Sequence, residues 1–164
     1  MEKIKDIREK VNLDSSKIEE IVQDIIQPYC EELDRYVDFI KSILQDGNNP
    51  PTSQELDDFC MNLSVYIYYA GGMQERLGIK DDIARAVYKE MYHSARESIG
   101  KGTVADKDSL AELASQQEYL TSVCYKRAYS IIKAKVTSAQ EILSSVKKII
   151  SRRMSEQELT RIGG

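Results

Sequence analysis

The fold is decided by residues 106–154, which read DKDSLAELASQQEYLTSVCYKRAYSIIKAKVTSAQEILSSVKKIISRRM. This stretch contains no proline and no glycine, and residues that favour helices predominate in it. A single helix over the whole stretch measures roughly 70 Å at 1.5 Å per residue, longer than a globular domain of this size needs. The stretch therefore predicts one very long C-terminal helix that packs against other helices.

An apolar seam runs along the second half of this predicted helix. Its members alternate at steps of four and three, and they are Ile132, Val136, Ala139, Leu143, Val146 and Ile150. Such a heptad-like pattern is typical of helices that pack side by side, within one chain or between copies. We expect these residues to form a core or an oligomer interface. Lys135 and Arg153 interrupt the seam, so the pattern does not choose an oligomer number.

The rest of the chain also has helical spacing, and no strand-like alternation is found in it. The predicted fold is all-α: a helical bundle with one very long C-terminal helix, oligomerising through helix packing. We divide the chain into an N-terminal arm (1–12), a region of three helices (13–105), the long basic helix (106–155) and a tail (156–164).

Local signals place the three helices. Ser16 with Glu19, and Thr52 with Glu55, have the spacing of capping boxes, which predicts helix starts on either side of the loop DGNNPPTS at 46–53. The first helix meets Pro28, where we expect a kink or a break. Gly71 and Gly72 suit a C-terminal cap of the second helix. A third helix follows Gly78, starts near Asp81 and Asp82, and ends near Ile99.

Charge is unevenly distributed along the chain. The formal net charge is -4, yet residues 126–161 hold nine basic and three acidic residues. The candidate DNA-contacting residues come from this stretch: Lys126, Lys133, Lys135, Lys147, Lys148, Arg152 and Arg153. On a helix Lys126, Lys133 and Lys147 form one line, which suits contacts with a phosphate backbone. The alternatives are a solvated helix face, or a basic face that docks onto the acidic remainder of the same or a neighbouring chain.

No catalytic site can be assembled from the sequence, so we expect a non-enzymatic protein without a cofactor. Walker A and dinucleotide-binding motifs are missing. His93 is the only histidine and is interpreted as a polar-face residue. The pairs Asp57–Asp58 and Asp81–Asp82 can hold a divalent ion, but their place in predicted first helical turns explains them as well. Tyrosine pairs four residues apart, such as Tyr125 and Tyr129, suit packing better than base stacking.

The compartment is expected to be the cytoplasm, or the host cytoplasm for a viral protein. No apolar run approaches bilayer length, and the N-terminus has no apolar secretion segment. Cys30, Cys60 and Cys124 are odd in number and far apart, so we expect small buried side chains.

Three short motifs occur in an order that resembles a known family. They are VNLDSSKI at 11–18, YYAGG at 68–72, and ADKDSL at 105–110 followed by IIK at 131–133. In order and approximate spacing the chain resembles the recombination mediator proteins of tailed phages, the UvsY type. The resemblance covers most of the chain through scattered motifs.

This resemblance implies a helical, ring-like homo-oligomer that binds single-stranded DNA. It also implies two protein partners, a RecA-like recombinase and the single-strand-binding protein from which the DNA is taken over. The family places basic residues before the paired aromatics, whereas MNLSVYI at 61–67 is uncharged. We therefore expect any DNA contact to lie on the C-terminal helix. The main alternative is a structural or scaffolding protein of a viral particle that binds other proteins through this helix.

Overall fold

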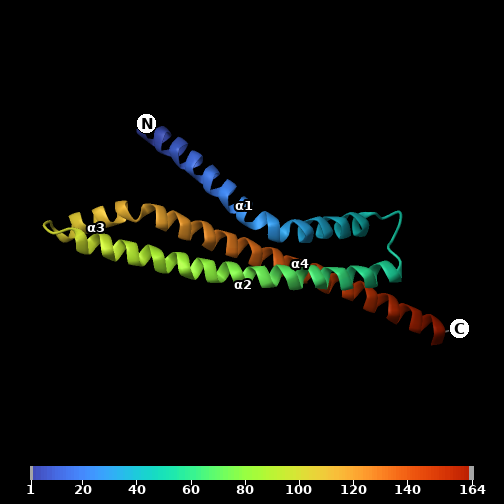
Figure 1. Ribbon diagram of the computed structural model, residues 1–164. Helices are drawn as coiled ribbons and strands as arrows, with labels where there is room; N and C mark the ends of the chain where they lie inside the picture. Colours follow the sequence, from blue (N-terminus) through green and yellow to red (C-terminus); the bar gives the residue numbers. More distant parts are fainter. Residues whose placement is uncertain (1, 163–164) are drawn as a thin grey trace. The chain divides into compact units, whose positions relative to one another are not determined.

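Four helices and their connections make up the described part of the chain. The structure is a computed structural model that describes the backbone of residues 2–162 and the side chains of residues 11 and 14–162. Its helices are α1 (Glu2–Gln45), α2 (Ser53–Ser98), α3 (Val104–Ala114) and α4 (Gln116–Ile162) (Figure 1). The all-α prediction is confirmed, and the long C-terminal helix α4, with 47 residues, packs against α2.

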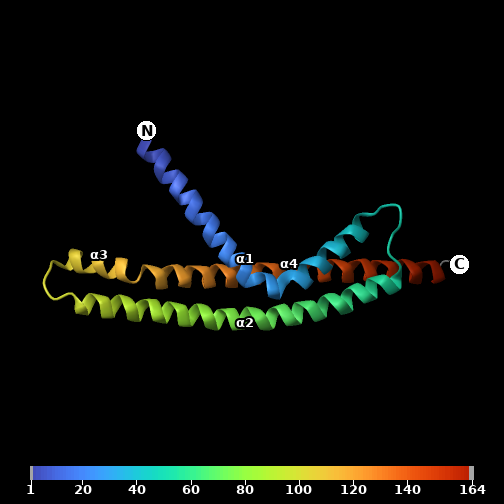
Figure 2. The ribbon, with the colours of Figure 1, turned by 45° about the horizontal axis from the view of Figure 1, so that its top comes forward.

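The chain divides into two compact units, each built from segments that are distant in sequence. Unit 1 comprises Met1–Gln27 and Gln74–Ile131, and unit 2 comprises Pro28–Met73 and Ile132–Gly164. Within each unit, α4 lies beside α2 and runs in the opposite direction (Figures 1 and 2). Each unit therefore has to be understood from its own contacts.

Unit 2 has an apolar core to which α1, α2 and α4 all contribute. The core side chains, at most 8% exposed, are Cys30, Leu33, Ile40, Leu56, Phe59, Leu63, Ala70, Ile132, Val136, Ala139 and Val146. Aromatic rings add to it: the centroids of Tyr36 and Tyr66 lie 5.1 Å apart. Each fully buried aliphatic side chain contributes about 1.5–3 kcal/mol relative to an exposed one. These apolar contacts stabilise unit 2 far more than its few polar ones.

Unit 1 has a core with smaller side chains. Its buried members include Val22, Ile26, Leu77, Ala111, Cys124 and Ala128. Gly78 allows close packing here, because a Cβ on this residue would lie 3.3 Å from Cε2 of Tyr129. The aromatic ring on α4 therefore packs directly over the backbone of α2.

Two helix starts are fixed by reciprocal hydrogen bonds. As predicted, the Thr52 hydroxyl accepts from the Glu55 backbone N–H, and the Glu55 carboxylate accepts from the Thr52 N–H at 2.7 Å. Thr103 and Asp106 form the same capping box at the start of α3. The loop before α2 and the helix end near Ile99 are also confirmed, since α1 ends at Gln45 and α2 at Ser98.

The predicted helix end at Gly71 and Gly72 is wrong. α2 continues through both glycines for a total of 46 residues, so one helix replaces the two that were expected. Glycine inside a helix costs about 1 kcal/mol relative to alanine. Ala70 and Leu77 are buried on either side of the pair, and burial of apolar side chains offsets that cost.

The predicted unbroken helix over 106–154 is interrupted at one residue. α3 ends at Ala114 and α4 begins at Gln116, with Ser115 between them at φ -105° and ψ 12°. The Ser115 side chain is fully buried, and its hydroxyl donates to the Ala111 carbonyl at 2.8 Å. The Ser115 N–H bonds the same carbonyl at 3.0 Å, and the equivalent hydroxyl bond from Ser145 to Glu141 leaves α4 unbroken, so the hydroxyl bond alone does not account for the break.

The ends of the first and last helices also differ from the prediction. α1 begins at Glu2 and is continuous through Ser16 and Pro28, so the predicted start near residue 13 is wrong and, of the kink or break expected at the proline, the break is not found. Ser16 therefore lies inside α1 and not at its start, and the hydroxyl of its neighbour Ser15 donates to the Val11 carbonyl. α4 continues to Ile162, through most of the segment that was predicted to be a tail.

As far as the structure describes them, none of the four helices combines the length and the apolar character needed to cross a bilayer.

Candidate nucleic-acid interface

The candidate basic residues of α4 in unit 2 separate into two groups. Lys133, Lys147, Lys148 and Arg152 are exposed, and they form no ion pair with the part of the chain that the structure describes. We call these four residues the basic row. Helical spacing places Lys148 and Arg152 opposite the buried seam and Lys133 and Lys147 beside it. Their charges therefore remain available to a ligand.

Lys135 and Arg153 belong instead to the fold of unit 2. The Lys135 ammonium donates to both oxygens of Asp34 on α1, at 2.7 and 2.6 Å. The Arg153 guanidinium donates to the carbonyl of buried Pro51 at 2.6 Å. The prediction that all seven basic residues share one role is therefore weakened for these two, which match the alternative of docking within the same chain.

Lys126 lies on the part of α4 that belongs to unit 1. It is exposed, as is its neighbour Arg127. The nearby Tyr125 ring has the Lys80 ammonium 5.8 Å from its centroid, a contact within the range of a cation–π interaction. Tyr125 and Tyr129 are both partly buried, so packing accounts for them better than base stacking does.

The apolar seam is covered by the chain's own helices. Ile132, Val136, Ala139 and Val146 are at most 8% exposed, while Leu143 and Ile150 are partly buried. Their burial within one chain explains the heptad-like pattern without a second copy. Their role as an interface between copies stays a prediction, and the core alternative has direct support.

Short hydroxyl side chains accompany the basic row. Thr137, Ser144 and Ser151 are exposed on α4 between its charged residues. Glu141 is the only acid on α4 between Ile132 and Met154. Small polar side chains let a phosphate approach the helix closely, and their hydroxyls can donate to phosphate oxygens. This face of α4 is therefore suited to a polyanion.

One edge of α2 borders the basic row at Cys60. Burial raises the pKa of the Cys60 thiol, the positive charge of Lys147 opposes that rise, and the negative charge of Asp57 adds to it. The Arg153 guanidinium binds the Pro51 carbonyl just before α2, which places Lys147 of the antiparallel α4 at about the level of Cys60. Cys30 and Cys124 are buried as expected, whereas Cys60 is only partly buried. Burial raises the pKa of the Cys30 and Cys124 thiols.

The exposed face of α2 in unit 2 is unusually apolar. Met61 is 72% exposed, Tyr68 77% and Tyr69 63%, with Val65 beside them on the same helix. The uncharged run MNLSVYI contributes part of this face. In the sequence, Tyr68 and Tyr69 contribute only to the motif YYAGG, and their exposure was not predicted. Helical spacing alone does not say which side of α2 is covered by other helices.

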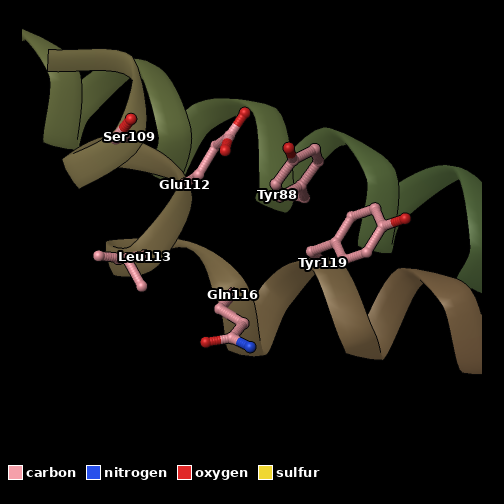
Figure 3. A pocket seen from close by; sticks show the side chains of 6 residues that line it. All are labelled: Tyr88, Ser109, Glu112, Leu113, Gln116 and Tyr119. Atoms are coloured by element: carbon pink, nitrogen blue, oxygen red, sulfur yellow. The ribbon is translucent and has the colours of Figure 1, made fainter. Parts of the chain in front are cut away.

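A cavity of about 630 Å³ lies in unit 1, where α3 and α4 meet α2. Figure 3 shows Tyr88 of α2 and Tyr119 of α4 beside each other at this cavity, and their ring centroids are 5.4 Å apart. Glu112, Leu113 and Gln116 also line it. Ser109 lines it as well, but within the described residues no hydrogen bond joins its hydroxyl to the Glu112 carboxylate, and His93 is exposed elsewhere on α2.

The paired carboxylates have explanations other than metal binding. Arg85 bridges Asp81 and Asp82 at 2.9 and 2.8 Å, in the middle of α2, so their predicted place in a first helical turn is wrong. Within the described residues, no three carboxylate, histidine or cysteine side chains gather in a way that suits a metal ion.

Comparison with known proteins identifies no family for this chain. No family model matches the chain, and neither the curated proteins nor the solved structures give a match.

Proposed function

We propose that this chain is a non-enzymatic accessory protein that binds single-stranded DNA and acts as a homo-oligomer in phage-type recombination or replication. The observation that supports this most is the basic row, whose four cations are exposed and unpaired within the described residues. Cations in this state release counterions from a nucleic-acid backbone when they neutralise its phosphates. The hydroxyl side chains between them suit the same backbone.

The resemblance to recombination mediators supplies the biological setting of the proposal. In that setting the protein holds the strand while a RecA-like recombinase replaces a single-strand-binding protein on it. Contacts from Lys and Arg to phosphates position a strand without reading its sequence, which is what such a task requires.

The test is fluorescence anisotropy of a labelled single-stranded oligonucleotide, titrated with the protein at several salt concentrations. We expect micromolar or tighter binding at low salt, of the order seen for nonspecific phosphate contacts, and steep weakening as salt rises. The double variant Lys147→Gln/Lys148→Gln should reduce the slope of log affinity against log salt by about 1.4, since each phosphate contact to a single strand contributes about 0.7.

The matched control is Lys89→Gln/Lys101→Gln, which removes the same charge from exposed positions in unit 1. It should leave the slope close to that of the unaltered protein. An equal loss in both double variants would mean that net charge, and not the basic row, governs binding. Failure of the unaltered protein to bind at low salt would contradict the proposal outright.

A second candidate function is that of a structural protein, favoured by an exposed apolar row on α2 in unit 1. Ile79 is 60% exposed, Ile83 57%, and Val87 and Met91 42% each. Exposed apolar rows on a helix commonly mark protein contacts. A structural protein should purify free of nucleic acid and keep its assembly at high salt, whereas a DNA-binding protein should show nuclease-sensitive bound nucleic acid.

A further inference from the structure

Tyr68 and Tyr69 are the most exposed of the ten tyrosines in the chain. Their exposed fractions are 77% and 63%, while Tyr119 reaches 49% and the other seven are at most partly exposed. The two rings contact each other edge to face, with centroids 5.6 Å apart. A tyrosine in a helix normally buries its ring and leaves only its hydroxyl in water. The core of unit 2 therefore does not explain these two side chains.

Their position relates them to the basic row. Cys60, Ser64 and Tyr68 are successive positions four residues apart, so they follow one side of α2. The Arg153 guanidinium donates to the Pro51 carbonyl just before α2 begins. On antiparallel helices Lys147, which precedes Arg153 on α4, therefore lies at about the level of Cys60, at one end of this line. Tyr68 is eight residues further along α2, about 12 Å at 1.5 Å per residue.

Helices α2 and α4 run antiparallel (Figure 2). Moving from Cys60 to Tyr68 on α2 therefore corresponds to moving from Lys147 toward Lys133 on α4. Those fourteen residues span about 21 Å. Tyr68 therefore lies at a level between the two lysines, close to the level of Gln140 and Ser144 on α4.

The chemistry of this arrangement distinguishes single strands from duplexes. Cations attract the phosphates of any nucleic acid, but an aromatic ring can stack only on a base whose face is free. Met61 and Val65 extend the apolar surface around the ring. A Cβ added at Gly71 or Gly72 would meet nothing within 4 Å, so the helix backbone next to the tyrosines is open to a flat ligand.

We propose that Tyr68 is a stacking platform for an unpaired base of a DNA strand whose phosphates lie on the basic row. Tyr69 supports the ring of Tyr68 through their edge-to-face contact. This inference rests on the proposed function and adds the element that selects single strands.

The decisive experiment uses the full chain and an oligothymidylate. Tyr68→Trp introduces the only tryptophan, so its emission reports on this position alone. We expect quenching when the oligonucleotide binds. Tyr68→Ala should weaken binding by at least about fivefold, the lower limit for loss of one base stack, with an unchanged salt slope because no phosphate contact is lost. Tyr68→Phe keeps the ring and should retain nearly full affinity.

The outcomes separate the inference from the proposed function. The proposal that Tyr68 stacks on a base is contradicted if the unaltered protein binds and Tyr68→Ala binds equally well, or if the tryptophan emission does not change. Neither result contradicts the proposed binding of phosphates by the basic row. If the unaltered protein does not bind single-stranded DNA at all, both proposals are contradicted. Circular dichroism provides the folding control, since an exposed side chain can be replaced without loss of core.

Discussion

At the scale of single residues, the glycines of α2 have different surroundings. A Cβ at Gly71 meets nothing within 4 Å, whereas a Cβ at Gly78 lies 3.3 Å from the Tyr129 ring. Gly71→Ala should therefore raise the free energy of unfolding by about 0.5–1 kcal/mol, because alanine loses less backbone entropy in a helix. Gly78→Ala should gain less or lose stability, because the ring must move. Urea unfolding of both variants measures the difference.

The comparison between the two glycines serves as its own control. Both variants add the same methyl group to the same helix, so the intrinsic helix propensity cancels. Equal stabilisation by the two would contradict the close approach of Tyr129 to α2 in unit 1.

Residues of the same type also differ in role, and this limits what the sequence could predict of the candidate site. Lys133 and Lys135 are two positions apart and lie on different sides of α4. One is exposed, and the other binds Asp34 from a helix a hundred residues away. The sequence identified α4 as the basic element, but separating its free cations from its structural ones required the partner helices to be in place.

At the scale of helices, the capping boxes predict a dependence of stability on pH. Hydrogen bonds from the side chain and backbone of Thr103 lower the pKa of Asp106 below its ordinary value of 3.8. A carboxylate whose pKa is lowered in the folded state stabilises the fold above its unfolded pKa, and this stabilisation is lost as pH falls through the lowered value. Asp106→Asn should therefore show a smaller loss of stability between pH 6 and pH 3 than the unaltered protein.

Thermal unfolding at the two pH values measures this effect. Glu20→Gln removes an exposed acid from α1 and serves as the control, which should keep the pH dependence of the unaltered protein. The capping box at Thr52 and Glu55 should behave like that of α3, since bonds from the Thr52 backbone and hydroxyl lower the pKa of Glu55. A variant of Asp106 with unchanged pH dependence would contradict the cap.

Helix boundaries were predicted where local chemistry decides them. The loop at 46–53 and the cap at Thr52 follow from turn formers and a reciprocal hydrogen bond, both readable from neighbouring residues. The continuation of α2 through Gly71 was not predicted, because burial of Ala70 and Leu77 outweighs a poor local propensity. The break at Ser115 was missed because neither a proline nor a glycine marks it in the sequence.

At the scale of the whole molecule, the proposed homo-oligomer needs a surface other than the buried seam of α4. The apolar row Ile79, Ile83, Val87 and Met91 on α2 is the exposed alternative. Placing a charge there should weaken association, because an interface would have to bury that charge. The double variant Ile83→Glu/Val87→Glu should therefore have a lower mass by light scattering than the unaltered protein at equal concentration.

The control for association is Lys89→Glu/Lys101→Glu, which introduces two acids outside the apolar row. It should leave the mass unchanged at moderate salt. Monomeric behaviour of the unaltered protein at all concentrations would contradict the proposed homo-oligomer, whatever the variants do.

The interleaved construction of unit 2 also has a consequence for synthesis on the ribosome. Its bonds from Lys135 to Asp34 and from Arg153 to Pro51 join residues 101 and 102 positions apart. At about 5–20 residues per second, residue 132 is added roughly 3–12 s after residue 73. Throughout that interval the apolar faces around Leu33 and Leu63 lack the helix that covers them, so the nascent chain presents a site for chaperones until α4 is translated.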